Sequence, residues 1–385
     1  MALPNVNIEV NRSGLGQVSV SDDNIMGMIL HGVAVPSKLT LDEPFVIYGV
    51  EDAEAHGIDA TNNAAAYKQV QGFYAEAGNG AKLYVIVTGA TKMSEDFASS
   101  ANKLVEYAGG AISVIGVTQG SSQGTEVSGG LNSDVSTAMT AAQTFAENCQ
   151  KAIKPLNIVL DGAGYSGNAE DLTDLTTMSN NRVSVLLGAA DASKHACVGL
   201  LMGRLATIPV QRKISRVKDG AVVGIETAYL TDGKEIEGRE ATLDTIHDKG
   251  YIVLRQFTGL SGWYFSSDMT ATADTDDLNT ISHNRIIDKV IRIAYKTYVN
   301  EIDDDVDIDS TNGTIDATVI SYLKGQIETQ VNGNMSDEVS QFYCDIRPDQ
   351  NILSGLPLEI DLFIVPKGYL NNIKVKIGFT NPLAK

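Results

Sequence analysis

A glycine-rich turn carries the most recognisable chemical pattern in this sequence. Residues 162–167 read Gly-Ala-Gly-Tyr-Ser-Gly and match the Gly-x-Gly-x-x-Gly turn, whose backbone N–H groups bind a pyrophosphate between a strand and a helix. Asp161 precedes the turn, and Glu170 and Asp171 follow it, where a phosphate would need positive potential. We therefore interpret it as an ordinary glycine-rich turn, and a nucleotide-binding enzyme stays open as an alternative.

An acidic segment has the residue types of a divalent-cation site. Residues 305–309 read Asp-Val-Asp-Ile-Asp and begin like the calcium loop of an EF-hand. Ser310 stands where that loop needs glycine for a sharp turn, and Asp316 stands where it needs glutamate. A solvated acidic loop is the better interpretation, and an ion site is the alternative.

The side chains that most often act as catalysts or metal ligands are scattered along the chain. They are His31, His56, His195, His247, His283, Cys149, Cys197 and Cys344. None has metal-ligand spacing to another, and no Gly-x-Ser-x-Gly nucleophile turn occurs. The three cysteines predict neither a disulfide framework nor a zinc site. We therefore expect a protein without enzymatic activity, cofactor or metal.

A stripe of four cations lies on a predicted helix over residues 283–302. Arg285, Lys289, Arg292 and Lys296 follow one another at spacings of four, three and four, which places them on one helix face. The chain has 29 basic and 48 acidic residues, a net charge of −19, so this stripe is locally unusual. Two interpretations stay open: a solvated face balanced by carboxylates of the same helix, or a docking surface for an acidic partner.

Both ends of the chain alternate apolar and polar residues. The apolar members are Val6, Ile8 and Val10 at the N-terminus and Ile373, Val375, Ile377 and Phe379 at the C-terminus. This period of two is typical of a half-buried strand. The second arm could pair with residues 358–364 if a turn at 366–368 closes. Because a free strand edge is an aggregation hazard, we expect each arm to pair, either within its chain or by adding a strand to a neighbouring subunit.

Between these arms, helices and strands alternate. Strands are predicted over residues 82–88, 111–117, 156–160 and 183–188, and helices over residues 62–77, 94–108, 134–152, 169–179 and 192–206. This alternation predicts an α/β fold with a doubly wound parallel sheet. After Pro209 the pattern changes to short strands and loops, and α+β elements follow. They are helices over 240–249, 283–302 and 317–331, and strands over 251–257, 340–346, 356–365 and 369–379.

These elements predict four parts of the chain. They are an N-terminal strand arm (1–22), an α/β domain (23–255, with subdivisions considered near 130 and 210), an α+β domain (256–365) and a C-terminal strand arm (366–385). The hydrophobic fraction of 43% is ordinary for a globular protein. The acidic excess disfavours binding to nucleic acid or to an anionic membrane surface. The longest mostly apolar run, residues 25–36, is too short to span a bilayer, and no leader pattern is present, so we expect synthesis and folding in a cytoplasm.

Several stretches together resemble the sheath proteins of contractile tails, as found in phages, R-type bacteriocins and related injection systems. They are residues 203–206, residues 248–257 followed by Trp263, residues 284–289 and residues 373–382. The resemblance implies an outer α/β domain, an inner α+β domain, and terminal arms that exchange strands between subunits of stacked hexameric rings. It also implies a structural subunit that surrounds an inner tube in a metastable lattice and contracts to drive the tube through a target envelope.

The resemblance further implies the partners and the location of the protein. The partners would be other copies of this chain, the inner tail tube protein, and the baseplate and tail terminator proteins, with no nucleic acid and no direct membrane insertion. The particle would be a virion tail or an injection system assembled in the bacterial cytoplasm. The tube-facing candidates would be Arg285, Lys289, Arg292 and Lys296, with Lys324 of the following helix as the competitor. A static shell built by strand addition remains a further alternative.

Overall fold

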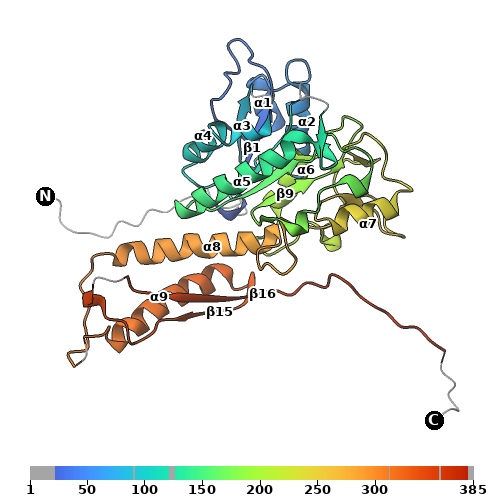
Figure 1. Cartoon of the computed structure of the whole chain (residues 1–385). Coiled ribbons are helices and arrows are strands. Elements are labelled where there is room, and N and C mark those ends of the chain that lie inside the picture. The colour runs from blue at the N-terminus through green and yellow to red at the C-terminus, as the bar shows by residue number, and fades with distance from the viewer. Residues whose placement is uncertain (1–21, 90–91, 121–125, 312, 355–356, 380–385) are drawn as a thin grey trace. The chain divides into compact units, whose positions relative to one another are not determined.

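We describe the protein from a computed structural model (Figure 1). The structure describes residues 22–379 except 90–91, 121–125, 312 and 355–356. The chain divides into two compact units, Met1–Lys296 and Thr297–Lys385.

A six-stranded sheet forms the centre of the first unit. Its strands are β1 (Met26–His31), β2 (Phe45–Ile47), β3 (Leu83–Thr88), β4 (Val114–Val117), β7 (Asn157–Asp161) and β9 (Val183–Leu186). The order is β2-β3-β1-β4-β7-β9, and all neighbours are parallel except β2, which runs antiparallel to β3. Every residue of the five parallel strands is buried, which explains their nearly continuous apolar sequences. The sheet confirms the predicted α/β fold.

Helices cover both faces of this sheet. The principal ones are α2 (Ala64–Ala77), α4 (Ser100–Tyr107), α5 (Ser133–Lys151) and α6 (Val198–Thr207). A Cβ added at Gly27 of β1 would meet Leu104 of α4, whereas one added at Gly116 of β4 would meet Met202 of α6. Gly27 pairs with Ile115, the residue before Gly116, so the two glycines point to opposite faces. Helices α4 and α6 therefore lie on opposite sides of the sheet.

Helices α2 and α6 pack against each other more closely than side chains would normally allow. A Cβ at Gly199 of α6 would lie 1.9 Å from the main-chain oxygen of Gln69, and one at Gly203 would lie 2.4 Å from that of Phe73. Glycine at these two positions, one turn apart, lets the helix backbones touch. Next to this contact, Arg204 forms a buried ion pair with Glu76 at 2.8 Å. Gly203 and Arg204 thus hold α6 against α2.

The remaining elements of the first unit are short. They are α1 (Val50–Ala55), α3 (Met93–Asp96), α7 (Glu240–Asp248), β5 (Val127–Ser128), β6 (Leu131–Asn132), β8 (Ser179–Asn180), β10 (Gly188–Ala189), β11 (Tyr229–Leu230), β12 (Leu254–Arg255), β13 (Tyr264–Phe265) and β14 (Ala271–Thr272). The helix predicted over 169–179 is wrong: two 3-10 turns, Ala169–Asp171 and Leu175–Thr177, stand there instead. Asn168 and Asp174 accept hydrogen bonds from backbone N–H groups two residues on, and such local bonds compete with a longer helix.

The division between the two units differs from the boundary expected after residue 255. Strand β13 pairs with β12, and β14 pairs with β8, so residues beyond 255 belong to sheets of the first unit. Helix α8 (Ile281–Tyr298) is buried over its first half, and only its last two residues fall in the second unit. Strands of only two residues are too short to show an alternating pattern, so their pairing with distant strands cannot be predicted from the sequence.

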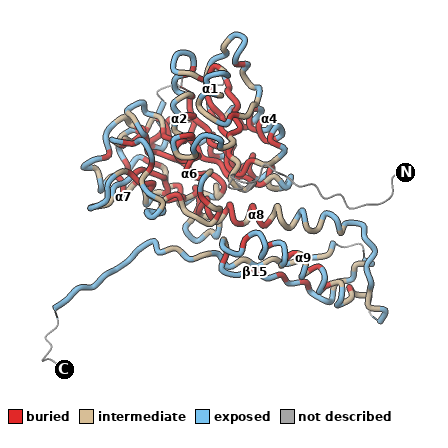
Figure 2. The backbone as a smooth tube through the Cα atoms, turned by 180° about the vertical axis from the view of Figure 1, so that it is seen from behind, coloured by how far each residue is buried: buried red, intermediate tan, exposed pale blue. Residues whose placement is uncertain are grey.

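The second unit consists of a helix on a two-stranded sheet. Helix α9 (Ala317–Met335) buries Ile320, Leu323, Ile327, Val331 and Met335, which recur at helical spacing. Strand β15 (Val339–Asp345) pairs antiparallel with β16 (Asp361–Pro366). The predicted helix over 317–331 and strand over 340–346 are confirmed. Beyond β16, the described residues have no assigned secondary structure, and Figure 2 shows them exposed along almost their whole length.

Candidate functional site

The predicted cation stripe lies on α8, and its first member is buried. Arg285 is 2% exposed. Its Nη2 donates to Oδ1 of Asn24 at 2.6 Å. The same nitrogen donates to the main-chain oxygens of Leu205 and Ile208, both at 3.3 Å. Arg285 therefore attaches α8 to the segment before β1 and to the end of α6.

The next two cations of the stripe also bind their own chain. Nζ of Lys289 lies 2.8 Å from Oδ2 of Asp23, and the two side chains are 9% and 15% exposed. Nη2 of Arg292 donates to the main-chain oxygens of Ile112 at 3.0 Å and Pro155 at 2.8 Å. Lys296 is exposed. Of the four cations only Lys296 is exposed, so the four do not form one solvent-facing surface in this chain. Sequence spacing does not distinguish a solvated cation from a buried one.

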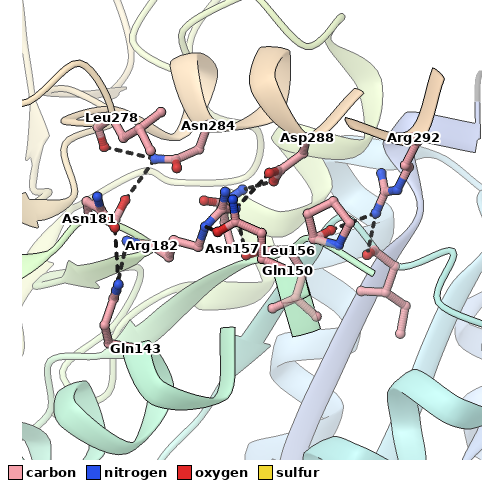
Figure 3. Close-up of polar contacts among 12 residues, drawn as sticks. Gln143, Gln150, Leu156, Asn157, Asn181, Arg182, Leu278, Asn284, Asp288 and Arg292 are labelled. Carbon is pink, nitrogen blue, oxygen red and sulfur yellow. Dashed lines mark hydrogen bonds and ion pairs between the residues drawn. The ribbon is translucent and has the colours of Figure 1, made fainter. Parts of the chain in front are cut away.

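Beside the cation stripe, α8 is also held by a buried polar network (Figure 3). Asp288 forms an ion pair with Arg182 at 2.7 Å, and their side chains are 2% and 1% exposed. Nδ2 of Asn157 donates to Oδ2 of Asp288 at 3.0 Å. One turn earlier, Nδ2 of Asn284 donates to the main-chain oxygen of Asn181 at 2.8 Å. Burial raises the pKa of Asp288, while Arg182 opposes that shift by favouring the carboxylate.

Lys324, the competing candidate for a tube contact, lies on α9. Its Nζ forms an ion pair with Oδ1 of Asp345 on β15 at 2.8 Å, and the lysine side chain is 29% exposed. The hydrogen bond to Asp345 raises the pKa of Lys324. Lys324 is therefore partly accessible, and it also links helix to sheet within the second unit.

The C-terminal arm is the most unusual surface of the chain. Its apolar side chains are exposed: Leu370 88%, Ile373 74%, Val375 72%, Ile377 94% and Phe379 111%. Residues 369–379 have no assigned secondary structure, so the strand predicted there is absent from this structure. Strand β16 pairs with β15 instead of with the arm. The N-terminal arm residues Val6, Ile8 and Val10 lie outside the described residues.

The sheet of β15 and β16 offers places where further strands could bind. A two-stranded sheet has one unpaired edge on each strand, and no other strand of the described chain pairs with β15 or β16. One face is covered by α9, which contacts β15. On the other face, the rings of Tyr343 and Phe363 stack with centroids 4.8 Å apart, and both are more than 40% exposed.

The glycine-rich turn lacks the parts of a phosphate site. The N–H group of Gly162 donates to the main-chain oxygen of Leu186 at 2.8 Å, and a Cβ at Gly162 would lie 2.7 Å from that same oxygen. The turn is followed by the 3-10 helix Ala169–Asp171 and not by an α-helix. In the described ranges, no group of three or more His, Cys, Asp or Glu side chains is arranged to hold a metal ion. Gly162 therefore serves the close approach of β7 to β9, and Gly164 and Gly167 adopt the positive φ angles of the turn.

A cavity of about 460 Å³ lies at the carboxyl ends of the parallel strands. His31 ends β1, Gln119 follows β4, and Asp161 ends β7, and all three line the cavity. Nδ1 of His195 lies 3.1 Å from Oδ2 of Asp161, a hydrogen bond that raises the pKa of His195. Nε2 of His31 lies 3.0 Å from Oδ2 of Asp96, and burial raises the pKa of this aspartate.

Metal-ligand spacing between histidines does not predict this group of residues, because His31 and His195 are 164 positions apart and have different carboxylate partners. A usable signal was present, since His31, Gln119 and Asp161 each stand at or just beyond the end of a buried apolar strand. Carboxyl ends of parallel strands meet at one edge of a sheet, so polar residues there converge.

Sequence comparisons place the whole chain in two adjacent family domains. A family model described as the DUF2586 N-terminal domain matches residues 3–269, and one described as the DUF2586 C-terminal domain matches residues 277–384. A search of curated proteins gave no significant match. No helix in the described part of the chain is both long and apolar enough to cross a membrane.

Solved structures with the same fold are sheath proteins of contractile injection systems. The helical sheath of the anti-feeding prophage in its contracted state matches with a TM-score of 0.63 and 13% identity, covering 99% of each chain. The contracted PVC sheath complex of an extracellular contractile injection system matches with a TM-score of 0.61 and 12% identity, covering 100% of this chain and 98% of that one. The sheath tail protein Lin1278 from Listeria innocua matches with a TM-score of 0.50 and 10% identity, covering 89% and 94%.

Proposed function

The chain belongs to the DUF2586 family and shares the fold of contractile injection system sheath proteins, and on this premise we propose that it is the structural subunit of a contractile sheath. It polymerises around an inner tube as stacked hexameric rings and contracts to drive that tube through a target envelope. It performs no catalysis. The energy for contraction is stored in a metastable extended lattice.

The observation that carries this proposal is the exposed apolar arm. Ile373, Val375, Ile377 and Phe379 alternate with polar residues, yet the described chain provides no strand to pair with them. Burying such a side chain stabilises by about 1.5–3 kcal/mol relative to leaving it in water. An arm that is unpaired in one subunit therefore favours strand addition to another subunit.

The receiving surface is the sheet of β15 and β16. Its two unpaired edges can accept one strand each, and the exposed rings of Tyr343 and Phe363 supply an apolar surface beside them. The C-terminal arm would occupy one edge. The N-terminal arm with Val6, Ile8 and Val10 would occupy the other, so that each subunit links to two neighbours through backbone hydrogen bonds.

Strand exchange also explains how a lattice could contract without coming apart. The connections made by the arms persist while the bodies of the subunits rotate and slide. On this proposal the first unit is the outer α/β domain, and the second unit is the inner domain next to the tube. Lys296 and Lys324, the accessible members of the predicted cation set, are the candidate tube contacts. Other partners would be the baseplate and the tail terminator, in a tail or an injection particle.

Electron microscopy of the purified chain tests this function. We expect striated hollow tubes at high protein concentration. A chain lacking residues 369–385 should remain folded and fail to form tubes, because β16 is intact but the arm is missing. The double variant Lys374→Ser/Lys376→Ser keeps the apolar face of the arm and serves as the matched control that still assembles.

Two outcomes would contradict parts of the proposal. Tubes formed by the truncated chain would show that the arm is not required for assembly. A single helical lattice under all conditions, including with a baseplate present, would indicate a static shell instead of a contractile sheath. Two distinct lattices from the same chain would support contraction.

A further inference from the structure

The cavity of the first unit lies where the parallel sheet changes direction. From β1 the chain crosses to β3 on one side, whereas from β4 it crosses to β7 on the other side. The strands β1 and β4 are neighbours, with Ile29 paired to Val117, so the residues that follow them lie side by side. In open α/β sheets, the crevice at such a switch point is the usual place for a ligand.

Two buried polar side chains in this cavity carry atoms that have no hydrogen-bond partner in the described chain. Gln119 is 4% exposed, and both its amide oxygen and its amide nitrogen lack a hydrogen bond. His31 is 8% exposed, and its Nδ1 also lacks one, while its Nε2 lies close to Asp96. Leaving buried polar atoms unpaired costs about 1–3 kcal/mol for each group, so such atoms usually have a partner. The Gln119 amide presents a donor and an acceptor to the cavity, and Nδ1 of His31 is a second acceptor when Nε2 donates its proton to Asp96.

The other residues that line the cavity limit the kind of ligand that it could bind. Ala64, Ala65, Ala75, Leu200 and Val223 supply apolar walls, and the small residues of α2 leave the space between the helices open. A volume of about 460 Å³ falls in the range of roughly 300–1,000 Å³ that is typical of small-molecule sites.

The charges of the cavity are already balanced by the protein. Nζ of Lys68 pairs with Oδ2 of Asp191 at 2.7 Å, and His195 pairs with Asp161 at 3.1 Å. No cation that lines the cavity in the described structure is therefore left over for a phosphate chain. A planar, uncharged ligand with adjacent donor and acceptor atoms fits these walls better than a nucleotide does.

We infer that this cavity binds an uncharged nucleoside through the edge of its base. The amide of Gln119 pairs with a donor and an acceptor of the base in the two-bond manner that glutamine uses with adenine, and Nδ1 of His31 accepts a further bond. The base lies against the alanine face of α2. This site is separate from the glycine-rich turn and from the arms, so its occupation does not depend on sheath assembly.

Ligand-observed NMR and calorimetry on the full chain test this inference, with adenosine, guanosine, cytidine and uridine as probes. We expect saturable binding of at least one nucleoside. Gln119→Leu removes the donor and acceptor, and Ala65→Trp fills the mouth of the cavity from an exposed position on α2. Each should weaken binding about tenfold or more. Gln256→Leu, at an exposed glutamine outside this cavity, is the matched control and should bind like the unaltered chain.

The same titrations can overturn the inference. Absence of saturable binding by all four nucleosides would remove the site. Binding that survives both Gln119→Leu and Ala65→Trp would place the nucleoside elsewhere on the chain. A nucleoside monophosphate that binds more than about tenfold tighter than its nucleoside would contradict an uncharged ligand. None of these outcomes bears on whether the chain forms the tubes expected in electron microscopy, so this inference and the sheath proposal fail independently.

Discussion

Arg182 and Asp288 form an ion pair at 2.7 Å between the start of β9 and the middle of α8, and both side chains are almost completely buried. The pair is separated by 106 positions in sequence. It attaches α8 to the sheet, and Arg285, three residues earlier, attaches α8 to the segment before β1 through Asn24. Helix α8 is therefore an integral part of the first unit over most of its length.

Replacing Asp288 by alanine should strongly destabilise the first unit. The change leaves the guanidinium of Arg182 buried without its counter-charge, and breaking a buried pair in this way costs about 3–5 kcal/mol. Urea denaturation measures the loss. The double variant Arg182→Met/Asp288→Leu is the control and should be more stable than the Asp288→Ala variant. A loss below about 1 kcal/mol would contradict a structural role for the pair.

Replacing Gly199 by alanine should destabilise the contact between α2 and α6. The new Cβ would lie 1.9 Å from the main-chain oxygen of Gln69, and backbone cannot move aside without disrupting α2. Such overpacking costs about 1–3 kcal/mol. Gly325→Ala in α9 is the matched control, because nothing lies within 4 Å of its Cβ position. Alanine should stabilise there by about 0.5–1 kcal/mol, and equal effects at both sites would refute the packing argument.

Two buried glutamines should respond in opposite ways to replacement by leucine. Gln143 accepts a hydrogen bond from the backbone N–H group of Arg182 at 3.0 Å, so Gln143→Leu leaves that donor unpaired and should cost about 1–3 kcal/mol. Gln119 has no partner in the described chain, so Gln119→Leu should raise stability by about 1 kcal/mol. Thermal unfolding without added ligand compares them. A destabilising Gln119→Leu would mean that its amide is already satisfied.

The stability of the first unit should depend on the protonation of His195. The hydrogen bond to Asp161 raises the pKa of His195 above its ordinary value of 6.5. Because the folded state holds the proton more tightly, this contribution is fully present below pH 6.5 and is lost as the pH rises through the raised pKa. NMR titration measures the pKa directly, and Asp161→Asn should lower it. An unchanged pKa in that variant would assign the shift to another group.

Charge reversal at Lys289 and at Lys296 should distinguish an effect on the stability of the fold from an effect on binding to the inner tube. Lys289→Glu opposes the carboxylate of Asp23 at a buried site and should destabilise the fold by several kcal/mol. Lys296→Glu changes an exposed side chain and should alter stability by less than about 0.5 kcal/mol. Assembly of Lys296→Glu around the inner tube then tests the proposed contact. Normal assembly of that variant would leave Lys324 as the candidate.

The central strands and the longer helices follow from local sequence pattern, unlike the helix predicted over 169–179. The apolar runs of β3, β4 and β7 predict buried parallel strands, because every side chain of such a strand contacts a helix on one face or the other. The spacing of Ile320, Leu323, Ile327 and Val331 predicts α9 with its buried face. The alternation of Ile373 to Phe379 predicts a strand, whereas the structure leaves these residues exposed and without assigned secondary structure, so their pairing stays a prediction.

The roles of the polar residues were decided only by tertiary structure. Spacing places Arg285 and Lys289 on one helix face, but whether that face meets water depends on Asn24 and Asp23, more than 250 positions away. Likewise, the cavity joins His31, Gln119 and Asp161 because β1, β4 and β7 are neighbours in the sheet. Sequence periodicity reports contacts within one element. The topology of the sheet determines which distant charges and amides become buried together, and burial is what sets their energies.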